Sequence, residues 1–168
     1  KHARDLPWRR TRDPYVVWVS EVMLQQTQVQ TVIPYFERFV GAFPSIRVLA
    51  QATKEEVMSH WSGLGYYSRA RRLHQAAKIL HETERELPRT HHELRGLPGI
   101  GAYISAAIAS IAFSEVIAAM DGNVERTISR WLALRENPRS AAAQRRIRIA
   151  AQALLDRVAV ETAQRGDQ

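Results

Sequence analysis

The acidic side chain of Glu21 lies in a setting that could change its chemistry. It is the one charged residue in the otherwise apolar run 15–24. A carboxyl group in apolar surroundings is partly desolvated, which raises its pKa and suits it to act as a general acid near neutral pH. The alternative is that Glu21 lies on the solvent side of an amphipathic helix.

A second acidic side chain, Asp121, opens the sequence Asp-Gly-Asn at positions 121–123. These residue types favour a turn by themselves. At a helix start, however, nearby backbone N–H groups would keep the Asp121 carboxylate ionised, and the carboxylate could then stabilise a cation. A plain turn and a functional carboxylate are both compatible with the local sequence.

Three polar side chains, Gln25, Gln26 and Thr27, directly follow the apolar run that carries Glu21. They mark either the boundary of a helix or a set of amide and hydroxyl groups that reach into a groove. The sequence around them does not distinguish these two interpretations.

Residues 94–101 form a glycine-rich segment, Leu-Arg-Gly-Leu-Pro-Gly-Ile-Gly, between two expected helices. Gly99 and Gly101 would let the backbone turn tightly and approach another chain closely. The segment ends at a helix N-terminus, where free N–H groups and the helix dipole favour an anion such as a phosphate. An ordinary corner between two helices is the alternative. The spacing Leu-Pro-Gly-Ile-Gly before a helix of small residues is typical of the helix-hairpin-helix DNA-binding motif.

The spacing of apolar and capping residues predicts helices along the whole chain. The predicted N-terminal caps are Asp13 (with Pro14 at the first helical position), Thr27, Thr53 (in a capping box with Glu56) and Asn123. The expected helices span about 15–24, 28–39, 54–60, 68–84, 91–95, 102–113, 124–134 and 140–163. No run of residues has the pattern of strands joined by hairpin turns. The sequence therefore predicts an all-α domain with short connections.

Composition limits the classes of function. The chain has 168 residues, of which 45% are hydrophobic, and this is enough for a core; no apolar run reaches the length of a membrane helix. It has no cysteine, which excludes disulfides, thiolate metal sites and iron–sulfur ligands from these residues. The net charge of +7 favours a polyanionic partner such as nucleic acid. The alternative is that the basic residues simply form a solvated surface. The start of the chain shows no signal-peptide pattern, and because it has no initiator methionine we expect a trimmed fragment.

Taken together, these segments resemble the helix-hairpin-helix DNA glycosylase superfamily, and within it the MutY-type adenine glycosylases. The resemblance covers nearly the whole chain and keeps the order of the family's motifs. The matching segments are 4–9, 20–29, 32–36, 63–71, the hairpin at 94–101, and 121–124.

The resemblance implies an activity and roles for the two carboxylates. MutY-type enzymes flip adenine out of a duplex in which it is mispaired with 8-oxoguanine or guanine, and cut its bond to the sugar. Glu21 matches the general acid that protonates the adenine ring at N7. Asp121 matches the carboxylate that stabilises the oxocarbenium-like sugar, and Asn123 matches a residue that supports this carboxylate and the activated water. Two carboxylates in opposite protonation states are also what glycosidases use.

The resemblance also implies roles for other positions. Tyr103 stands where endonuclease III-type enzymes have a lysine that forms a Schiff base and goes on to nick the strand; the family therefore implies a monofunctional glycosylase with Tyr103 at the reaction centre, although a core aromatic would explain this residue as well. Gln26 and Tyr66 match residues that wedge into the base stack. Pocket or lesion-facing positions are matched by Arg4, Leu6, Trp8, Arg9, Leu24 and Thr27.

The family's fold has two helical lobes flanking a DNA-binding cleft. By resemblance, residues 23–122 form a six-helix module that contains the hairpin (about 94–103), and residues 1–22 with 123–168 form the second lobe. Full-length relatives continue with four cysteines that hold a [4Fe–4S] cluster, and then with a domain that helps to recognise 8-oxoguanine. We expect no cofactor and no side-chain metal site in this chain, with a monovalent cation possible on the hairpin carbonyls.

The expected partner is double-stranded DNA with a mispaired adenine, bound by a monomer that has no membrane association. A bacterial, nucleoid-associated location is expected first, and the nucleus or mitochondrion for a eukaryotic source. Two other functions remain open. One is a catalytically impaired fragment that holds DNA through the hairpin, which the two carboxylates argue against. The other is an endonuclease III-like lyase for oxidised pyrimidines, which Tyr103 argues against.

Overall fold

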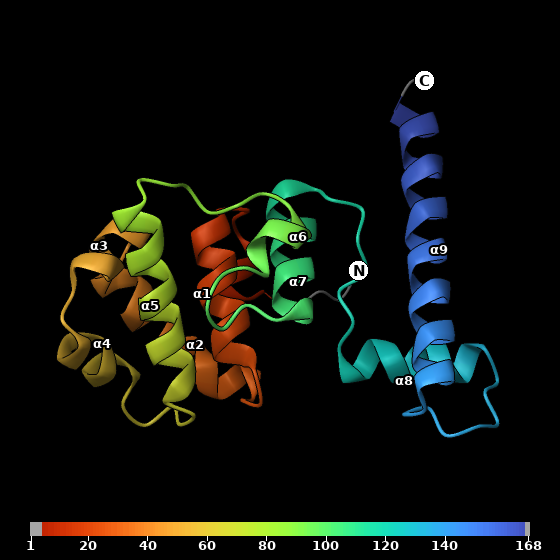
Figure 1. The fold of residues 1–168 in the computed structure, drawn as a ribbon, viewed down its shortest axis with the longest axis horizontal. Helices are drawn as coiled ribbons and strands as arrows, with labels where there is room; N and C mark the ends of the chain where they lie inside the picture. Colours follow the sequence, from red (N-terminus) through yellow and green to blue (C-terminus); the bar gives the residue numbers. More distant parts are fainter. Residues whose placement is uncertain (1–4, 167–168) are drawn as a thin grey trace.

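The computed structural model describes residues 5–166, and the elements in this range are all helices, which confirms the all-α prediction. Figure 1 shows their arrangement. In chain order the elements are η1 (Pro7–Arg9), α1 (Pro14–Leu24), α2 (Val29–Ala42), α3 (Ile46–Gln51), α4 (Lys54–Trp61), α5 (Ser68–Glu82), α6 (His91–Leu94), α7 (Ala102–Phe113), α8 (Gly122–Trp131) and α9 (Ala141–Gly166). No helix in the described range is long and apolar enough to span a membrane.

Two of the predicted N-terminal caps are confirmed. The Asp13 carboxylate accepts hydrogen bonds from the backbone N–H groups of residues 15 and 16, and Pro14 is the first residue of α1. Thr53 and Glu56 form the predicted capping box of α4. These caps depend only on residues within one helical turn, which is why the local sequence predicts them.

Two other predicted caps, and one boundary, are wrong. Thr27 does not cap α2: the N-cap residue is Gln28, and the helix runs through Gly41 to Ala42. Asn123 does not cap α8 either, because the carboxylate of Asp121 accepts the hydrogen bonds from the first turn. The sequence pattern also missed α3, a helix of six residues that is capped by Ser45.

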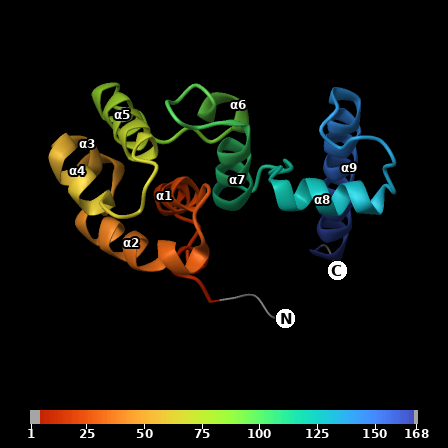
Figure 2. The ribbon, with the colours of Figure 1, turned by 90° about the horizontal axis from the view of Figure 1, so that it is seen from below.

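Helix α1 lies at the centre of the larger of two hydrophobic clusters. Every residue from 17 to 23 is buried, and the helix contacts α2, α5 and α7. Figure 2 shows α1 between these three helices. A helix that is covered on all sides belongs to a core, so a polar group in its middle loses most of its contact with water.

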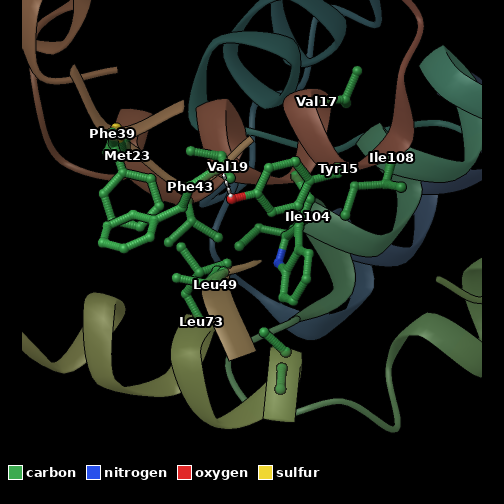
Figure 3. Packing of buried hydrophobic residues seen from close by; sticks show 14 of the residues in the cluster. Tyr15, Val17, Val19, Met23, Phe39, Phe43, Leu49, Leu73, Ile104 and Ile108 are labelled. Carbon is green, nitrogen blue, oxygen red and sulfur yellow. Dashed lines mark hydrogen bonds between the residues drawn. The ribbon is translucent and has the colours of Figure 1, made fainter. Parts of the chain in front are cut away.

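The surrounding side chains are large and interlock at aromatic edges. Phe39 meets the rings of Phe43 and Trp61 edge to face, at centroid distances of 4.9 and 5.6 Å. Figure 3 shows Phe39 and Phe43 within this cluster. The Tyr15 hydroxyl donates a hydrogen bond of 2.6 Å to the carbonyl of Phe43. The ring contacts join α2 to α4, and the hydrogen bond of Tyr15 joins the start of α1 to the C-terminal end of α2.

The second cluster is much smaller and belongs to α8 and α9. Its buried members are Ile128, Ile147 and Ala151. Gln152 on α9 also holds the connection that precedes α8, because its side-chain amide bonds to the backbone of residues 116 and 118. In Figures 1 and 2 α9 stands apart from the helices α1–α7, and Trp131 is 62% exposed.

The predicted grouping of residues 1–22 with residues 123–168 stays a prediction. Within the described range, Leu6, Trp8 and the residues of α1 pack in the larger cluster, next to α2 and α7. The buried and half-buried side chains of the smaller cluster all come from residue 118 onward. Side-chain packing thus joins the described part of segment 5–22 to the larger cluster.

Candidate active site

A pocket of about 450 Å³ opens at the C-terminal end of α1. It brings together six residues that the sequence analysis singled out, although they are up to a hundred positions apart in the chain: Glu21, Leu24, Gln26, Tyr66, Tyr103 and Asp121. Three helices and two loops supply them, and only the tertiary fold places these elements next to one another.

Glu21 forms the deep wall of the pocket. Its side chain is 8% exposed, and its Oε2 atom has no hydrogen-bond partner among the described residues. Burial raises the pKa of Glu21; the hydroxyl of Tyr103 opposes this effect, and the negative charge of Asp121 adds to it. The solvent-exposed alternative for Glu21 is therefore wrong. A carboxyl group in this environment holds a proton to higher pH than an ordinary glutamate does.

Tyr103, in the first turn of α7, is the side chain that meets Glu21 in the pocket. It is half-buried, and burial together with the nearby charges of Glu21 and Asp121 raises its pKa. The hydroxyl therefore stays protonated and can donate a hydrogen bond to the Glu21 carboxyl group. Tyr103 also packs against the larger cluster. The core and pocket interpretations of Tyr103 consequently describe two ends of the same side chain.

Asp121 is placed at the pocket by the start of α8. Its Oδ1 atom accepts hydrogen bonds from the backbone N–H groups of Asn123 (3.0 Å) and Val124 (2.7 Å), and its Oδ2 atom accepts one from the Asn123 side chain (2.9 Å). Burial by itself raises the pKa of Asp121. The three hydrogen bonds and the charge of Arg126 together lower it by more, so the net shift of the pKa is downward.

Asn123 lies beside the pocket rather than in its wall, and it links Asp121 to a cation. The Arg126 guanidinium donates a hydrogen bond to Oδ1 of Asn123, whose amide nitrogen in turn donates to Asp121. This chain fixes the orientation of the Asn123 amide, since its oxygen accepts from Arg126 while its nitrogen donates. The hydrogen bond that such support of Asp121 requires is present, and the role of Asn123 in the reaction stays a prediction.

Gln26 and Tyr66 lie on two loops at the mouth of the pocket. Both have a left-handed backbone conformation, with φ angles of 55° and 48°, and the Tyr66 side chain is 57% exposed. Non-glycine residues rarely adopt this conformation, because it costs free energy that other contacts must offset. Both side chains are exposed and line the pocket.

The remaining predicted contact residues lie elsewhere. Leu6 and Trp8 are buried in the larger cluster, where the Trp8 ring packs edge to face on Phe36, so neither lines the pocket. Arg9 is exposed next to them. Arg4 falls outside the described residues. Thr27 does not line the pocket, but its hydroxyl accepts a hydrogen bond from Arg69, which does.

The predicted hairpin lies between α6 and α7. Gly99 has a φ of +81°, and a Cβ atom there would meet the Cβ atom of Arg72 on α5 at 2.7 Å. Glycine is thus needed at this position for both the turn and the close approach. Gly101 is the N-cap residue of α7, and a Cβ atom would fit there without a clash. The turn is confirmed for Gly99, whereas phosphate or cation binding by the hairpin stays a prediction.

Sequence reasoning missed two pocket residues, Ser68 and Arg69. Gln25, which the sequence left as either a helix boundary or a group that reaches into a groove, also lines the pocket. Arg69 was included only within the matching segment 63–71, with no role of its own. It is in fact buried, and it bonds to backbone carbonyls more than 40 positions earlier in the chain. No spacing within the sequence could reveal such a long-range contact.

The chain does not fit the iron–sulfur cluster that the family resemblance implies. Such a cluster needs thiolate ligands, and the 168 residues include no cysteine. In the described range, moreover, no three histidine or acidic side chains converge as a metal site would require.

These features define a class of protein: an all-α domain with a helix-hairpin-helix and with two carboxyl groups of opposite pKa shift in one pocket. The comparisons agree with it. Residues 19–152 match the HhH-GPD superfamily base excision DNA repair proteins. The chain therefore belongs to the HhH-GPD superfamily.

Similar curated proteins are named adenine DNA glycosylase. The protein of Rattus norvegicus is 48% identical over 166 residues, covering 93% of this chain and 32% of the relative. That of Homo sapiens is 47% identical, covering 93% and 30%, and that of Buchnera aphidicola subsp. Baizongia pistaciae (strain Bp) is 42% identical, covering 80% and 38%. The chain thus spans about a third of the length of these relatives.

Solved structures show the same fold. A thermostable thymine-DNA glycosylase matches with a TM-score of 0.79 and 28% identity, covering 90% of this chain and 70% of that one. A trapped covalent intermediate of endonuclease III with DNA matches with a TM-score of 0.68 and 25% identity, covering 74% and 60%. These matches confirm the predicted fold class.

Proposed function

We propose that the chain is the part of a monofunctional DNA glycosylase that removes adenine mispaired with 8-oxoguanine or guanine. The observation that carries this proposal is the pair of carboxyl groups in one pocket, with the pKa raised at Glu21 and lowered at Asp121. An acid that keeps its proton beside a carboxylate that stays ionised suits the cleavage of a glycosidic bond. The names of the relatives support adenine as the base.

The proposed reaction divides the work between the two groups. Glu21 transfers its proton to N7 of the flipped adenine, and the bond between C1′ and N9 then breaks with its electron pair moving onto the base. Asp121 stabilises the positive charge left on the sugar. Water adds to C1′ and releases one proton, which restores the acid. The products are free adenine and an abasic site.

The absence of an amine at Tyr103 supports a monofunctional reaction. A glycosylase that also nicks the strand uses an amine to form a Schiff base with the sugar. The Tyr103 hydroxyl, whose pKa is raised, is instead suited to hold the Glu21 carboxyl group in place. The proposed partner is double-stranded DNA bound by a monomer, and the proposed location is wherever the source organism keeps its DNA.

The test is a single-turnover incubation with a duplex that carries adenine opposite 8-oxoguanine, analysed with and without hot alkali. We expect strand cleavage only after alkali, and a loss of about 10²- to 10⁴-fold in the excision rate for Glu21→Gln. Glu37→Gln, at an exposed glutamate of α2, is the matched control and is expected to cut normally.

Other outcomes would favour the other functions. Intact binding of the duplex without any release of adenine would contradict the proposal and favour a DNA-binding fragment. Nicking without alkali, together with trapping of the protein on an abasic duplex by borohydride, would favour a lyase.

A further inference from the structure

Arg69 is a buried cation whose hydrogen-bond partners are all uncharged. It lies in the first turn of α5, its side chain is 8% exposed, and burial lowers its pKa. A buried charge without an ionic partner is costly unless polar groups surround it. The geometry of its contacts therefore indicates what the fold gains by placing an arginine here.

One nitrogen of the guanidinium holds the end of α1. Nη1 donates to the carbonyl oxygens of Val22 (3.1 Å), Met23 (2.7 Å) and Gln25 (2.5 Å). The last carbonyls of a helix lack partners within the helix and form the negative end of its dipole. The positive charge of Arg69 thus offsets the negative C-terminal end of α1, directly after Glu21 in the chain.

The other terminal nitrogen reaches both loops at the mouth of the pocket. Nη2 donates to the hydroxyl of Thr27 (3.1 Å) and to the carbonyl of Gly65 (3.3 Å). The guanidinium also lies over the ring of Tyr66, 5.2 Å from its centroid, and over that of Trp61 at 5.6 Å. One planar group therefore joins the end of α1 to the loop before α5.

The two loops that Arg69 joins carry the two strained residues of the pocket. Gln26 lies between Gln25 and Thr27, which Arg69 binds, and Tyr66 follows Gly65, which it also binds. Both residues have positive φ angles. Such conformations persist only where surrounding contacts hold them, and Arg69 supplies those contacts at both positions.

We propose that Arg69 is a positioning residue that locks the loops of Gln26 and Tyr66 together, at a fixed distance from Glu21. It acts through the backbone of these loops and not on the base. Its effect on catalysis rests on the proposed glycosylase function, whereas the locking of the loops does not.

The first experiment measures the locking itself by hydrogen–deuterium exchange. Arg69→Lys keeps the charge but lacks the planar fork that spans both loops. We expect exchange about tenfold faster in the peptides that cover residues 22–28 and 62–67, with α2 and α7 unchanged. The control Arg85→Lys, at an exposed arginine after α5, should change neither segment. No change in the two segments, or an equal acceleration everywhere, would overturn the proposal.

A milder variant covers the case in which Arg69→Lys does not fold. Thr27→Val keeps the shape of the side chain and removes one acceptor of Arg69. The proposal predicts that exchange accelerates by about twofold to threefold in both segments, including the one at 62–67 that lacks the substitution. Acceleration confined to residues 22–28 would overturn it.

The second experiment separates positioning from binding. Arg69→Lys is expected to lower the single-turnover excision rate by about tenfold or more, because small misplacements of reacting groups are costly. The Kd for an uncleavable duplex should change by less than about threefold. A rate within about twofold of the wild type would overturn the catalytic part of the proposal. If the wild type itself released no adenine, the proposed function would fail, while the exchange result would still decide whether Arg69 locks the loops.

Discussion

Glu21 and Asp121 border the same pocket but belong to regions that pack very differently. Glu21 lies in α1, a buried helix of the larger cluster that packs against α2, α5 and α7. Asp121 lies at the start of α8, which packs mainly on α9 in a cluster with three buried residues. Both carboxyl groups line the pocket because the connection from α7 to α8 ends with Asp121 next to the C-terminal part of α1.

The two regions control the pKa of their carboxyl groups by different means. Burial raises the pKa of Glu21, and that burial depends on α1, α2, α5 and α7 together. At Asp121 burial acts in the same direction but is outweighed by hydrogen bonds from Asn123 and Val124 and by the charge of Arg126, all within five residues. The packing of the whole larger cluster thus raises the pKa of Glu21, whereas contacts within the first turns of α8 lower the pKa of Asp121.

After the loss expected for Glu21→Gln, the next largest effect is expected from neutralising the carboxylate of Asp121. Asp121→Asn leaves a side chain that still caps a helix N-terminus, so α8 should form. In the proposed mechanism this substitution removes the negative charge that stabilises the sugar cation, and the excision rate should fall by about 10²- to 10³-fold. Single-turnover kinetics give the rate, and circular dichroism checks the helix content. A variant that is inactive because α8 has melted would contradict the purely electrostatic explanation.

A graded variant sharpens this result. Asn123→Ala keeps the carboxylate but removes a donor that lowers its pKa, so its rate should fall between those of the wild type and Asp121→Asn. The acidic limb of its pH–rate profile should move to higher pH, because Asp121 then takes up a proton more readily. An unchanged acidic limb would show that this hydrogen bond does not control the carboxylate.

The sequence predicted the local half of this comparison and not the other half. The cap at Asp13, the capping box at Thr53 and the N–H donors that hold the Asp121 carboxylate at a helix start follow from residues within one helical turn, whereas the predicted turn at 121–123 is instead the first turn of α8. The Thr27 cap is wrong because that hydroxyl accepts a hydrogen bond from Arg69, 42 positions away. The burial of Glu21 was open to two interpretations, because the apolar residues that cover it come from helices whose contacts no local pattern encodes.

The next effect concerns the pH dependence of the rate. The rate should fall as pH rises through the raised pKa of Glu21, because the acid loses its proton, and it should fall as pH drops through the lowered pKa of Asp121. The Tyr103 hydroxyl lowers the pKa of Glu21. Tyr103→Phe should therefore move the alkaline limb to higher pH, as measured by single-turnover rates across the pH range.

Asp121→Asn should move the same limb in the opposite direction. The negative charge of Asp121 raises the pKa of Glu21, so its loss lowers that pKa, and the effect should be visible in the residual activity. Tyr35→Phe, on α2, serves as the control for loss of a hydroxyl group and should leave both limbs in place. Movement of the limb in the same direction for Tyr103→Phe and Asp121→Asn would refute this account of the pocket.

The smallest effect is on stability, and it tests whether the core really determines the state of the acid. The folded pKa of Glu21 lies above its ordinary value of 4.5. Below that ordinary value both the folded and unfolded chains are protonated; as pH rises through the folded pKa, the buried group must ionise and the fold loses stability. Glu21→Gln is neutral at every pH, so it should raise the Tm by a few degrees at about pH 8 and by almost nothing at about pH 4. Glu37→Gln, at an exposed position, should show no such pH dependence. An equal gain at both pH values would mean that the substituted amide simply packs better, and that the proton on Glu21 does not depend on the core.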